Sequence, residues 1–254
     1  MCYETIVYQK RDRIANITLN RPEVNNIISP QLAQELLDIC SEVSQDEEVR
    51  VVTITGAGEA FCVGTDWSSF LSLKTAQPKL LSVAGAVAKL DCSIIAAING
   101  DALGQGLELA LACDIRIAAE GACLGLPQIA SGFIPWDGGT QRLPRLVGRA
   151  KAMEMLLLGE PISVREAYRI GLVNRVVTLE ELPLVVADMA RRMASSAPLA
   201  LRYAKEAINK GLELTLDQGL HLEADLYSLL QTTHDRTEGI TAFRGKRQPK
   251  FRGR

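Results

Sequence analysis

Short runs of aliphatic and β-branched residues alternate with amphipathic stretches over the first two thirds of the chain. Residues 6–8 and 14–19 flank a charged turn and predict a β-hairpin. Nearly continuous apolar runs, typical of parallel strands buried on both faces, occupy residues 49–55, 94–98 and 115–118. Ser29 followed by Pro30 predicts the start of a helix between them. This alternation predicts an α/β fold with mostly parallel strands.

The pattern changes near residue 182, beyond which apolar positions recur at helical spacing. Helices are predicted over residues 182–195, 200–210 and 216–230. We therefore expect an α/β core over residues 1–181 and a helical C-terminal subdomain over residues 182–254. The chain ends in a basic segment, residues 244–254, for which a solvated, partly frayed terminus is the plain interpretation.

Composition narrows the class of protein. Hydrophobic residues make up 47% of the 254 positions and charged residues 23%, so a full core is expected and disorder is not. The net charge of −2 gives no electrostatic case for a nucleic-acid partner. No uninterrupted apolar run is long enough for a bilayer, and the N-terminal residues resemble neither a signal nor a transit peptide. We expect a cytoplasmic protein with no membrane partner.

The six cysteines are scattered, with no C-x-x-C pair and no histidine at ligand spacing. They are expected to be reduced and mostly buried, and no metal site is predicted. The two histidines, His221 and His234, both fall in the helical part. We expect them to lie on the surface or in helix packing.

Three glycine-bearing turns stand out, at residues 61–67 (FCVGTDW), 99–109 (NGDALGQGLEL) and 132–143 (GFIPWDGGTQRL). Glycine lets a backbone N–H approach a ligand without side-chain obstruction. Two such N–H groups aimed at one carbonyl oxygen form an oxyanion hole, which is what a thioester enolate requires. The Gly-x-Gly of the second turn is no dinucleotide fingerprint, because Leu107 and Glu108 follow Gly106.

Together with residues 20–26 (NRPEVNN), 159–177 and 235–251, these turns occur in the order found in the crotonase (enoyl-CoA hydratase/isomerase) superfamily. The chain resembles that superfamily over nearly its whole length. The resemblance implies a stacked ββα core with a helical C-terminal subdomain for oligomerisation and coenzyme A contacts. It implies an acyl-CoA or acyl-carrier-protein thioester substrate, no cofactor apart from the coenzyme A of the substrate, and a homotrimer or dimer of trimers. Residues 21–26 and 61–67 also look like crotonase-like proteins of polyketide β-branching, which process carrier-protein thioesters.

By motif position, the resemblance places the oxyanion-hole N–H donors on Thr65 and Gln105, where relatives commonly have glycine at the second position. It places the first of two catalytic glutamates on Glu108, although an ordinary first-turn helix glutamate is the alternative. The second falls on Gln128, which can orient water or a carbonyl but cannot titrate. Loss of a positioned acid/base costs roughly 10²–10⁴-fold.

Trp136 and Asp137 replace a pair of small residues of the family hydratases. Asp137 is a candidate substitute acid/base, and a solvated turn aspartate is the alternative. Trp136 is expected to line the acyl pocket with Trp67 and Gly104, or simply to pack. Contacts to coenzyme A are implied for Val24, Asn25, Asp66, Phe243 and Lys246, the last two often from a neighbouring subunit.

Three hypotheses follow. The first is an enoyl-thioester hydratase or dehydratase with Glu108 as acid/base, assisted by Gln128 or Asp137. The second is a single-base isomerase, decarboxylase or ring-modifying lyase acting on a bulky acyl thioester, which the replacement at Gln128 favours. The third is a non-catalytic thioester-binding homologue, against which the retained Glu108 argues.

Overall fold

The computed structural model describes residues 3–72 and 82–254, so Cys2 lies outside it. A six-stranded sheet runs in the order β1 (Ile6–Arg11), β2 (Ile14–Leu19), β3 (Val51–Gly56), β4 (Ser93–Ile98), β6 (Ile115–Ala119) and β9 (Arg175–Val177). Only β1 and β2 pair antiparallel in this sheet; the other neighbouring pairs are parallel. A smaller sheet contains β5 (Ala102–Leu103), β7 (Cys123–Gly125) and β8 (Ile162–Ser163).

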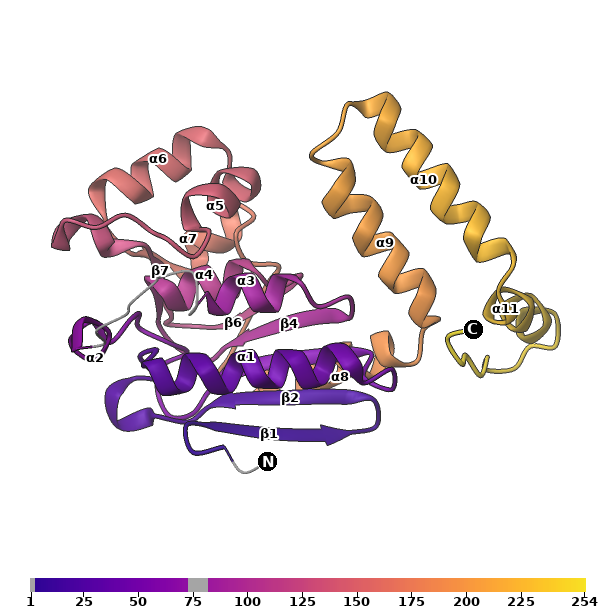
Figure 1. The fold of residues 1–254 in the computed structure, drawn as a ribbon, viewed down its shortest axis with the longest axis horizontal. Helices are drawn as coiled ribbons and strands as arrows, with labels where there is room; N and C mark the ends of the chain where they lie inside the picture. The colour runs from indigo at the N-terminus through magenta and orange to yellow at the C-terminus, as the bar shows by residue number, and fades with distance from the viewer. Residues whose placement is uncertain (1–2, 73–81) are drawn as a thin grey trace.

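The helices follow the strands as the alternation predicts, and Figure 1 shows their arrangement. In the core they are η1 (Pro22–Val24), α1 (Pro30–Gln45), α2 (Trp67–Ser72), α3 (Val83–Ala88), α4 (Gln105–Leu111), η3 (Pro127–Ser131), α5 (Gly139–Val147), α6 (Arg149–Leu158) and α7 (Val164–Arg169). Beyond them lie α8 (Leu182–Ala194), α9 (Pro198–Gly211), α10 (Leu216–Gln231) and α11 (His234–Arg244).

The expected hairpin and buried parallel strands are confirmed. The expected start of α1 is confirmed too, because the Ser29 hydroxyl accepts a hydrogen bond from the Leu32 N–H at 3.2 Å. The pattern does not predict the short strands of the smaller sheet, since a two- or three-residue strand carries too few positions for any periodicity.

Hydrophobic side chains fill both faces of the large sheet. Along β4, Ile94 and Ile98 face the cluster that includes α1, α3 and α4, whereas Ile95 faces a second cluster formed with α8. From α8 the second cluster receives Leu182, Val186, Ala190 and Ala194. The first helix of the expected C-terminal subdomain therefore lies against the core sheet; a boundary at residue 182 stays a prediction.

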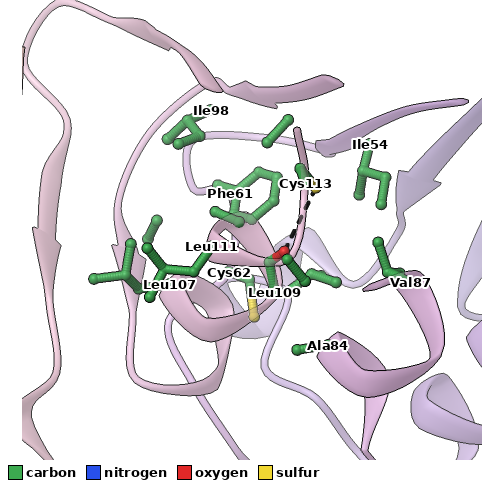
Figure 2. Close-up of a cluster of buried hydrophobic side chains, with 14 of the residues drawn as sticks. Ile54, Phe61, Cys62, Ala84, Val87, Ile98, Leu107, Leu109, Leu111 and Cys113 are labelled. Carbon is green, nitrogen blue, oxygen red and sulfur yellow. Dashed lines mark hydrogen bonds between the residues drawn. The ribbon is translucent and has the colours of Figure 1, made fainter. Parts of the chain in front are cut away.

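Phe61 anchors the first glycine turn to the larger cluster. Its side chain is fully buried and lies with Ile98 and with Leu111, the last residue of α4 (Figure 2). The following residue, Cys62, is equally buried. The base of the first glycine turn is therefore part of the hydrophobic core, while the residues after it lie nearer the surface.

Helices α9 and α10 run side by side and extend away from the core (Figure 1). The end of the chain returns to the body. The buried Arg50 donates to the Phe251 carbonyl at 2.9 Å, and the buried Asp235 carboxylate accepts the N–H groups of Arg252 and Gly253, each at 2.7 Å. The expectation of a frayed end is therefore wrong for residues 251–253, because two buried charges hold their backbone. Residues 244–250 are exposed, which agrees with the solvated part of the expectation.

Candidate active site

The first two glycine turns are stacked on each other by backbone hydrogen bonds. The N–H groups of Phe61 and Cys62 both donate to the Asp101 carbonyl at 3.1 Å, and the Leu103 N–H donates to the Cys62 carbonyl at 2.9 Å. Gly104 has a φ of +55°, and a β-carbon there would lie 3.5 Å from the Gly64 Cα and 3.6 Å from Nε2 of Gln128. Gly104 therefore lies where the two turns and Gln128 meet, and its place in an acyl pocket stays a prediction.

A buried asparagine holds the NRPEVNN turn beside this stack. The Asn26 side chain donates to the carbonyls of Ala57 and Ala60 at 2.8 Å and accepts the Arg21 N–H at 2.9 Å. The neighbouring Asn25 carbonyl accepts the Val63 N–H at 3.2 Å. Sequence reasoning missed Asn26, although a polar residue in a tight turn is a frequent turn-builder.

Thr65 and Gln105, the two expected donor residues, are joined through their side chains. The Thr65 hydroxyl donates to Oε1 of Gln105 at 2.8 Å, and the Gln105 residue is 1% exposed. Gln105 is the first residue of α4, where backbone N–H groups have no acceptor within the helix. The structure thus brings both residues to one place, with the Gln105 side chain folded back into the protein.

Glu108 is fully buried in the first turn of α4, so the alternative of an exposed helix glutamate is wrong. Its Oε1 accepts the N–H groups of Asp137 and Gly139 at 2.7 and 2.8 Å, and its Oε2 accepts Nε2 of Gln128 at 3.3 Å. Burial raises the pKa of Glu108 from 4.5 to about 7, against the two backbone hydrogen bonds that lower it. The nearby Asp137 charge raises this pKa further, and Arg142 lowers it. A carboxyl group that titrates near neutrality can both take up and release a proton.

Gln128 presents one end of its amide to Glu108 and keeps the other end unpaired. Its Oε1 is buried and has no hydrogen-bond partner among the residues that the structure describes. A buried acceptor without a partner is costly in a folded protein and is most often explained by water or a ligand. Gln128 is therefore suited to receive an O–H or N–H beside the Glu108 carboxyl.

Asp137 is 4% exposed, so the alternative of a solvated turn residue is wrong. Only its backbone N–H reaches Glu108. Its carboxylate points to the N-terminus of α3 and accepts hydrogen bonds from the Ser82 hydroxyl, the N–H groups of Ala84 and Gly85, and Nε2 of Gln105. Sequence reasoning missed Ser82, which also caps α3 and could have been found as a Ser before a small-residue helix.

The aromatic residues Trp67, Phe133 and Trp136 belong to the first and third glycine turns. Trp67 stacks on Phe133, with ring centroids 4.8 Å apart and planes 7° from parallel. Sequence reasoning missed Phe133, although it is an aromatic residue in the same glycine turn as Trp136. The indole Nε1 of Trp136 is buried without a hydrogen-bond partner in the described part of the chain. Whether either indole lines an acyl pocket stays a prediction.

The residues expected to contact coenzyme A come from both ends of the chain. Val24 ends η1, and Asn25 follows it in a left-handed conformation. The Asp66 carboxylate accepts hydrogen bonds from Ser68 and Ser69, which lower its pKa and cap α2. Phe243 is 85% exposed near the end of α11, and Lys246 follows that helix. Their expected contacts stay predictions.

Within residues 3–72 and 82–254, no three His, Cys, Asp or Glu side chains are grouped so that they could hold a metal ion. None of the helices in these ranges combines the length and the apolar character that a membrane crossing needs. His221 and His234 are both exposed, on α10 and α11.

The stacked turns, the buried carboxyl and the mixed sheets define a crotonase fold, which the comparison with solved structures confirms. An enoyl-CoA hydratase from Bacillus anthracis has a TM-score of 0.94 over 99% of this chain and all of that one, at 40% identity. The family model described as enoyl-CoA hydratase/isomerase matches residues 9–254. The chain therefore belongs to the enoyl-CoA hydratase/isomerase family, and is an enzyme of the lyase or isomerase kind.

Two curated relatives carry more specific names. A crotonyl-CoA hydratase of Syntrophomonas wolfei is 39% identical over 257 residues, which cover 99% of each chain. An (E)-benzylidenesuccinyl-CoA hydratase of Thauera aromatica is 40% identical over 262 residues, which cover 98% of this chain and 99% of the relative. An acyl-CoA thioester fits the family as substrate.

Proposed function

We propose that this protein is an enoyl-thioester hydratase or dehydratase in which Glu108 is the only acid/base. The observation that carries this proposal is the Glu108 carboxyl itself. It is buried, its pKa is raised to about 7, and two backbone N–H groups hold its Oε1. Its Oε2, which accepts the longer 3.3 Å bond from Nε2 of Gln128, is the oxygen proposed for proton transfer. Relatives that are named hydratases support the direction of the reaction.

In the proposed hydration the Glu108 carboxyl transfers a proton twice, first from water and then to the enolate. Oε2 of ionised Glu108 takes a proton from water as the water oxygen bonds to C3 of the enoyl thioester. The electron pair of the double bond moves to the thioester oxygen, which the N–H groups of Thr65 and Gln105 stabilise. The enolate then takes the proton back from Glu108 at C2, so that one water has been added and Glu108 is ionised again.

Gln128 orients the water in this proposal. The water donates one hydrogen to Oε2 of Glu108 and the other to Oε1 of Gln128, the buried acceptor with no hydrogen-bond partner among residues 3–72 and 82–254. Asp137 is proposed as a residue that positions Glu108 and not as a second acid/base. Its carboxylate is already engaged by donors from α3 and by Gln105.

A single-base isomerase, decarboxylase or ring-modifying lyase is the second candidate. One carboxyl that removes a proton from one carbon and returns it to another needs no water-activating partner, and Gln128 leaves only Glu108 for that work. The Trp67 and Phe133 stack and the second indole at Trp136 support a bulky or cyclic acyl group. In either case the proposed reaction needs no cofactor, and the acyl group is carried as a thioester of coenzyme A or of a carrier protein. The proposed assembly is a trimer or hexamer, and the proposed location is the cytoplasm.

Mass spectrometry in ¹⁸O- and deuterium-labelled water tests the reaction. Crotonyl-CoA, cyclic and aryl enoyl-CoA thioesters, their carboxylated analogues and the matching carrier-protein thioesters would be incubated with wild-type protein and with Glu108→Gln. Oxygen incorporation by the wild type alone establishes the hydratase. A moved double bond or deuterium exchange without oxygen establishes the isomerase, and loss of carbon dioxide the decarboxylase. Binding of all substrates with no Glu108-dependent turnover leaves the binding homologue.

The reaction should depend on pH through Glu108. Because proton removal needs the ionised carboxyl, kcat/KM should rise with pH and level off above about 7, where burial places the pKa. It should fall about tenfold for each pH unit below that value. The measurement is a pH–rate profile with a pantetheine thioester, which lacks the titrating phosphates of coenzyme A. A profile that is flat between pH 5 and 9, or a midpoint near the ordinary glutamate value, would contradict it.

Gly106 should be intolerant of a side chain. A β-carbon there would overlap the Cys62 backbone carbonyl, so alanine must push the start of α4 away from the first glycine turn. Displacement of the Gln105 N–H by about 1 Å should lower kcat/KM about 10²-fold. Gly211→Ala is the matched control, because nothing lies within 4 Å of its added carbon. Equal activity of the two variants would show that the close approach at Gly106 does not matter.

A further inference from the structure

Two of the residues that depart from the family pattern, Gln105 and Asp137, contact each other. Nε2 of Gln105 donates to Oδ2 of Asp137 at 3.1 Å, and both residues are buried, at 1% and 4% exposure. They lie on different glycine turns, 32 positions apart. A long amide and a carboxylate therefore meet where relatives commonly carry small residues.

This contact continues at both ends. On one side, Oε1 of Gln105 accepts the Thr65 hydroxyl at 2.8 Å, which joins the two turns that carry the proposed oxyanion-hole donors. On the other side, the backbone N–H of Asp137 holds Oε1 of Glu108 at 2.7 Å. One continuous chain of hydrogen bonds therefore links Thr65, Gln105, Asp137 and Glu108.

The hydrogen-bond chain is fixed to helix α3 at Asp137. The Asp137 carboxylate accepts the Ser82 hydroxyl and the N–H groups of Ala84 and Gly85, at the start of α3. A carboxylate at this end of a helix is favoured by the unpaired N–H groups there. Asp137 is thus anchored independently of Gln105, so the bond between them transmits position from α3 to the donor turns.

We propose that Gln105 and Asp137 form a coupled pair of positioning residues, which fixes the Thr65 and Gln105 N–H groups relative to the Glu108 carboxyl. The positioning role belongs to the side-chain bond between Gln105 and Asp137, which does not touch the reacting atoms, and is separate from the proposed donor role of the Gln105 backbone N–H. This inference rests on the proposed function, because it assigns the pair to the same oxyanion hole and acid/base. Buried networks in which every member is paired are rigid, and catalytic groups lose most of their effect when displaced by about 1 Å.

The pair also brings a charge to the site. The Asp137 carboxylate raises the pKa of Glu108, and Arg142, whose Nη1 donates to the Asp137 carbonyl at 2.8 Å, lowers it. Removing the charge of Asp137 without removing its bulk should move the activity midpoint to lower pH. A purely structural effect would change the height of the pH–rate profile and leave its midpoint in place.

Three substitutions test the donor side of the chain. Gln105→Ala keeps the backbone N–H and removes the side-chain bonds to Thr65 and Asp137. Thr65→Val removes the hydroxyl at nearly constant volume, and Thr65→Ser restores it. We expect Gln105→Ala and Thr65→Val each to lower kcat roughly 10–100-fold, with KM within about threefold of wild type, and Thr65→Ser to recover most of the loss.

A double variant distinguishes one connected chain of hydrogen bonds from two independent contacts, because the effects of connected residues do not multiply. Because the Thr65 hydroxyl reaches Asp137 only through Gln105, the double variant Thr65→Val/Gln105→Ala should lose no more than Gln105→Ala alone, within about threefold. Losses that multiply would overturn the proposal. So would wild-type kcat in Gln105→Ala.

Asp137→Asn tests the other side and is the isosteric choice, since Asp137→Ala risks unfolding α3. Its expected result is a lower kcat together with an activity midpoint shifted to lower pH. An unchanged midpoint with full kcat would overturn the role of Asp137. If Glu108→Gln retains activity on every thioester, the proposed function itself fails. If Glu108→Gln is inactive while the Gln105 and Thr65 variants behave as wild type, only the positioning pair fails.

Discussion

Glu108→Gln should lower kcat/KM with the best enoyl-CoA substrate by roughly 10²–10⁴-fold. The amide keeps the size of the side chain, and its oxygen can still accept the N–H groups of Asp137 and Gly139. It cannot take a proton from water or return one to the enolate. Steady-state kinetics on the thioester panel is the measurement. Activity within tenfold of wild type would remove Glu108 from the mechanism.

The same substitution has a second, independent signature in stability. Because burial raises the pKa of Glu108 from 4.5 to about 7, the folded protein holds a proton over that interval that the unfolded chain has released. This contribution to the free energy of unfolding is present below pH 4.5 and is lost as pH rises through about 7. Glu108→Gln lacks this dependence, so it should gain on the order of 3 kcal/mol relative to wild type between pH 4.5 and pH 8. Urea titrations of both proteins measure the difference.

Phe61→Ala should destabilise the protein by about 3–5 kcal/mol, because the ring is fully buried and its removal leaves a cavity under the first glycine turn. For a chain of this size the melting temperature should fall by roughly 6–20 °C. Below the new transition, kcat should also fall, since Thr65 belongs to this turn. Thermal unfolding monitored by circular dichroism, followed by kinetics at 20 °C below the midpoint, checks both effects.

Phe133→Ala provides the matched control for Phe61. The same ring is removed, but Phe133 is 44% exposed and stacks on Trp67. Its loss should cost about 1 kcal/mol or less, the value of one aromatic pair. Equal destabilisation by the two substitutions would mean that the first glycine turn is not supported by the core.

The sequence predicts a candidate residue when its chemical type is unusual for its surroundings. It does not predict the direction in which a side chain points or the partner that it contacts. Glu108 lies in an apolar run, where a carboxyl group is conspicuous, and Gln128 is conspicuous because it cannot titrate. For Asp137 the sequence allows two interpretations, a substitute acid/base and a solvated turn residue. Its carboxylate contacts Ser82, 55 positions away, and Gln105, 32 positions away. No local pattern encodes contacts of that separation.

The contacts of the C-terminal tail could not be predicted from the sequence either. A basic, glycine-containing tail has the composition of a frayed end, yet Arg50 and Asp235 hold its backbone. A buried charge is stable only when it is paired or hydrogen-bonded, and these two find their partners in the carbonyl and N–H groups of the tail. The requirement becomes visible only when burial is known.

By itself, the sequence determined that this chain folds as an α/β protein with buried parallel strands and a helical end, because hydrophobic periodicity and capping residues are local. It also determined the family. Of the two glutamate positions that the family pattern implies, Glu108 keeps a carboxyl group and Gln128 does not. Only the tertiary structure decided that Gln105 contacts Thr65 and Asp137, and that Asp137 offers Glu108 a backbone N–H instead of a second carboxyl. Hydrogen bonds between turns depend on how the strands beneath them are stacked, and that stacking is a property of the whole fold.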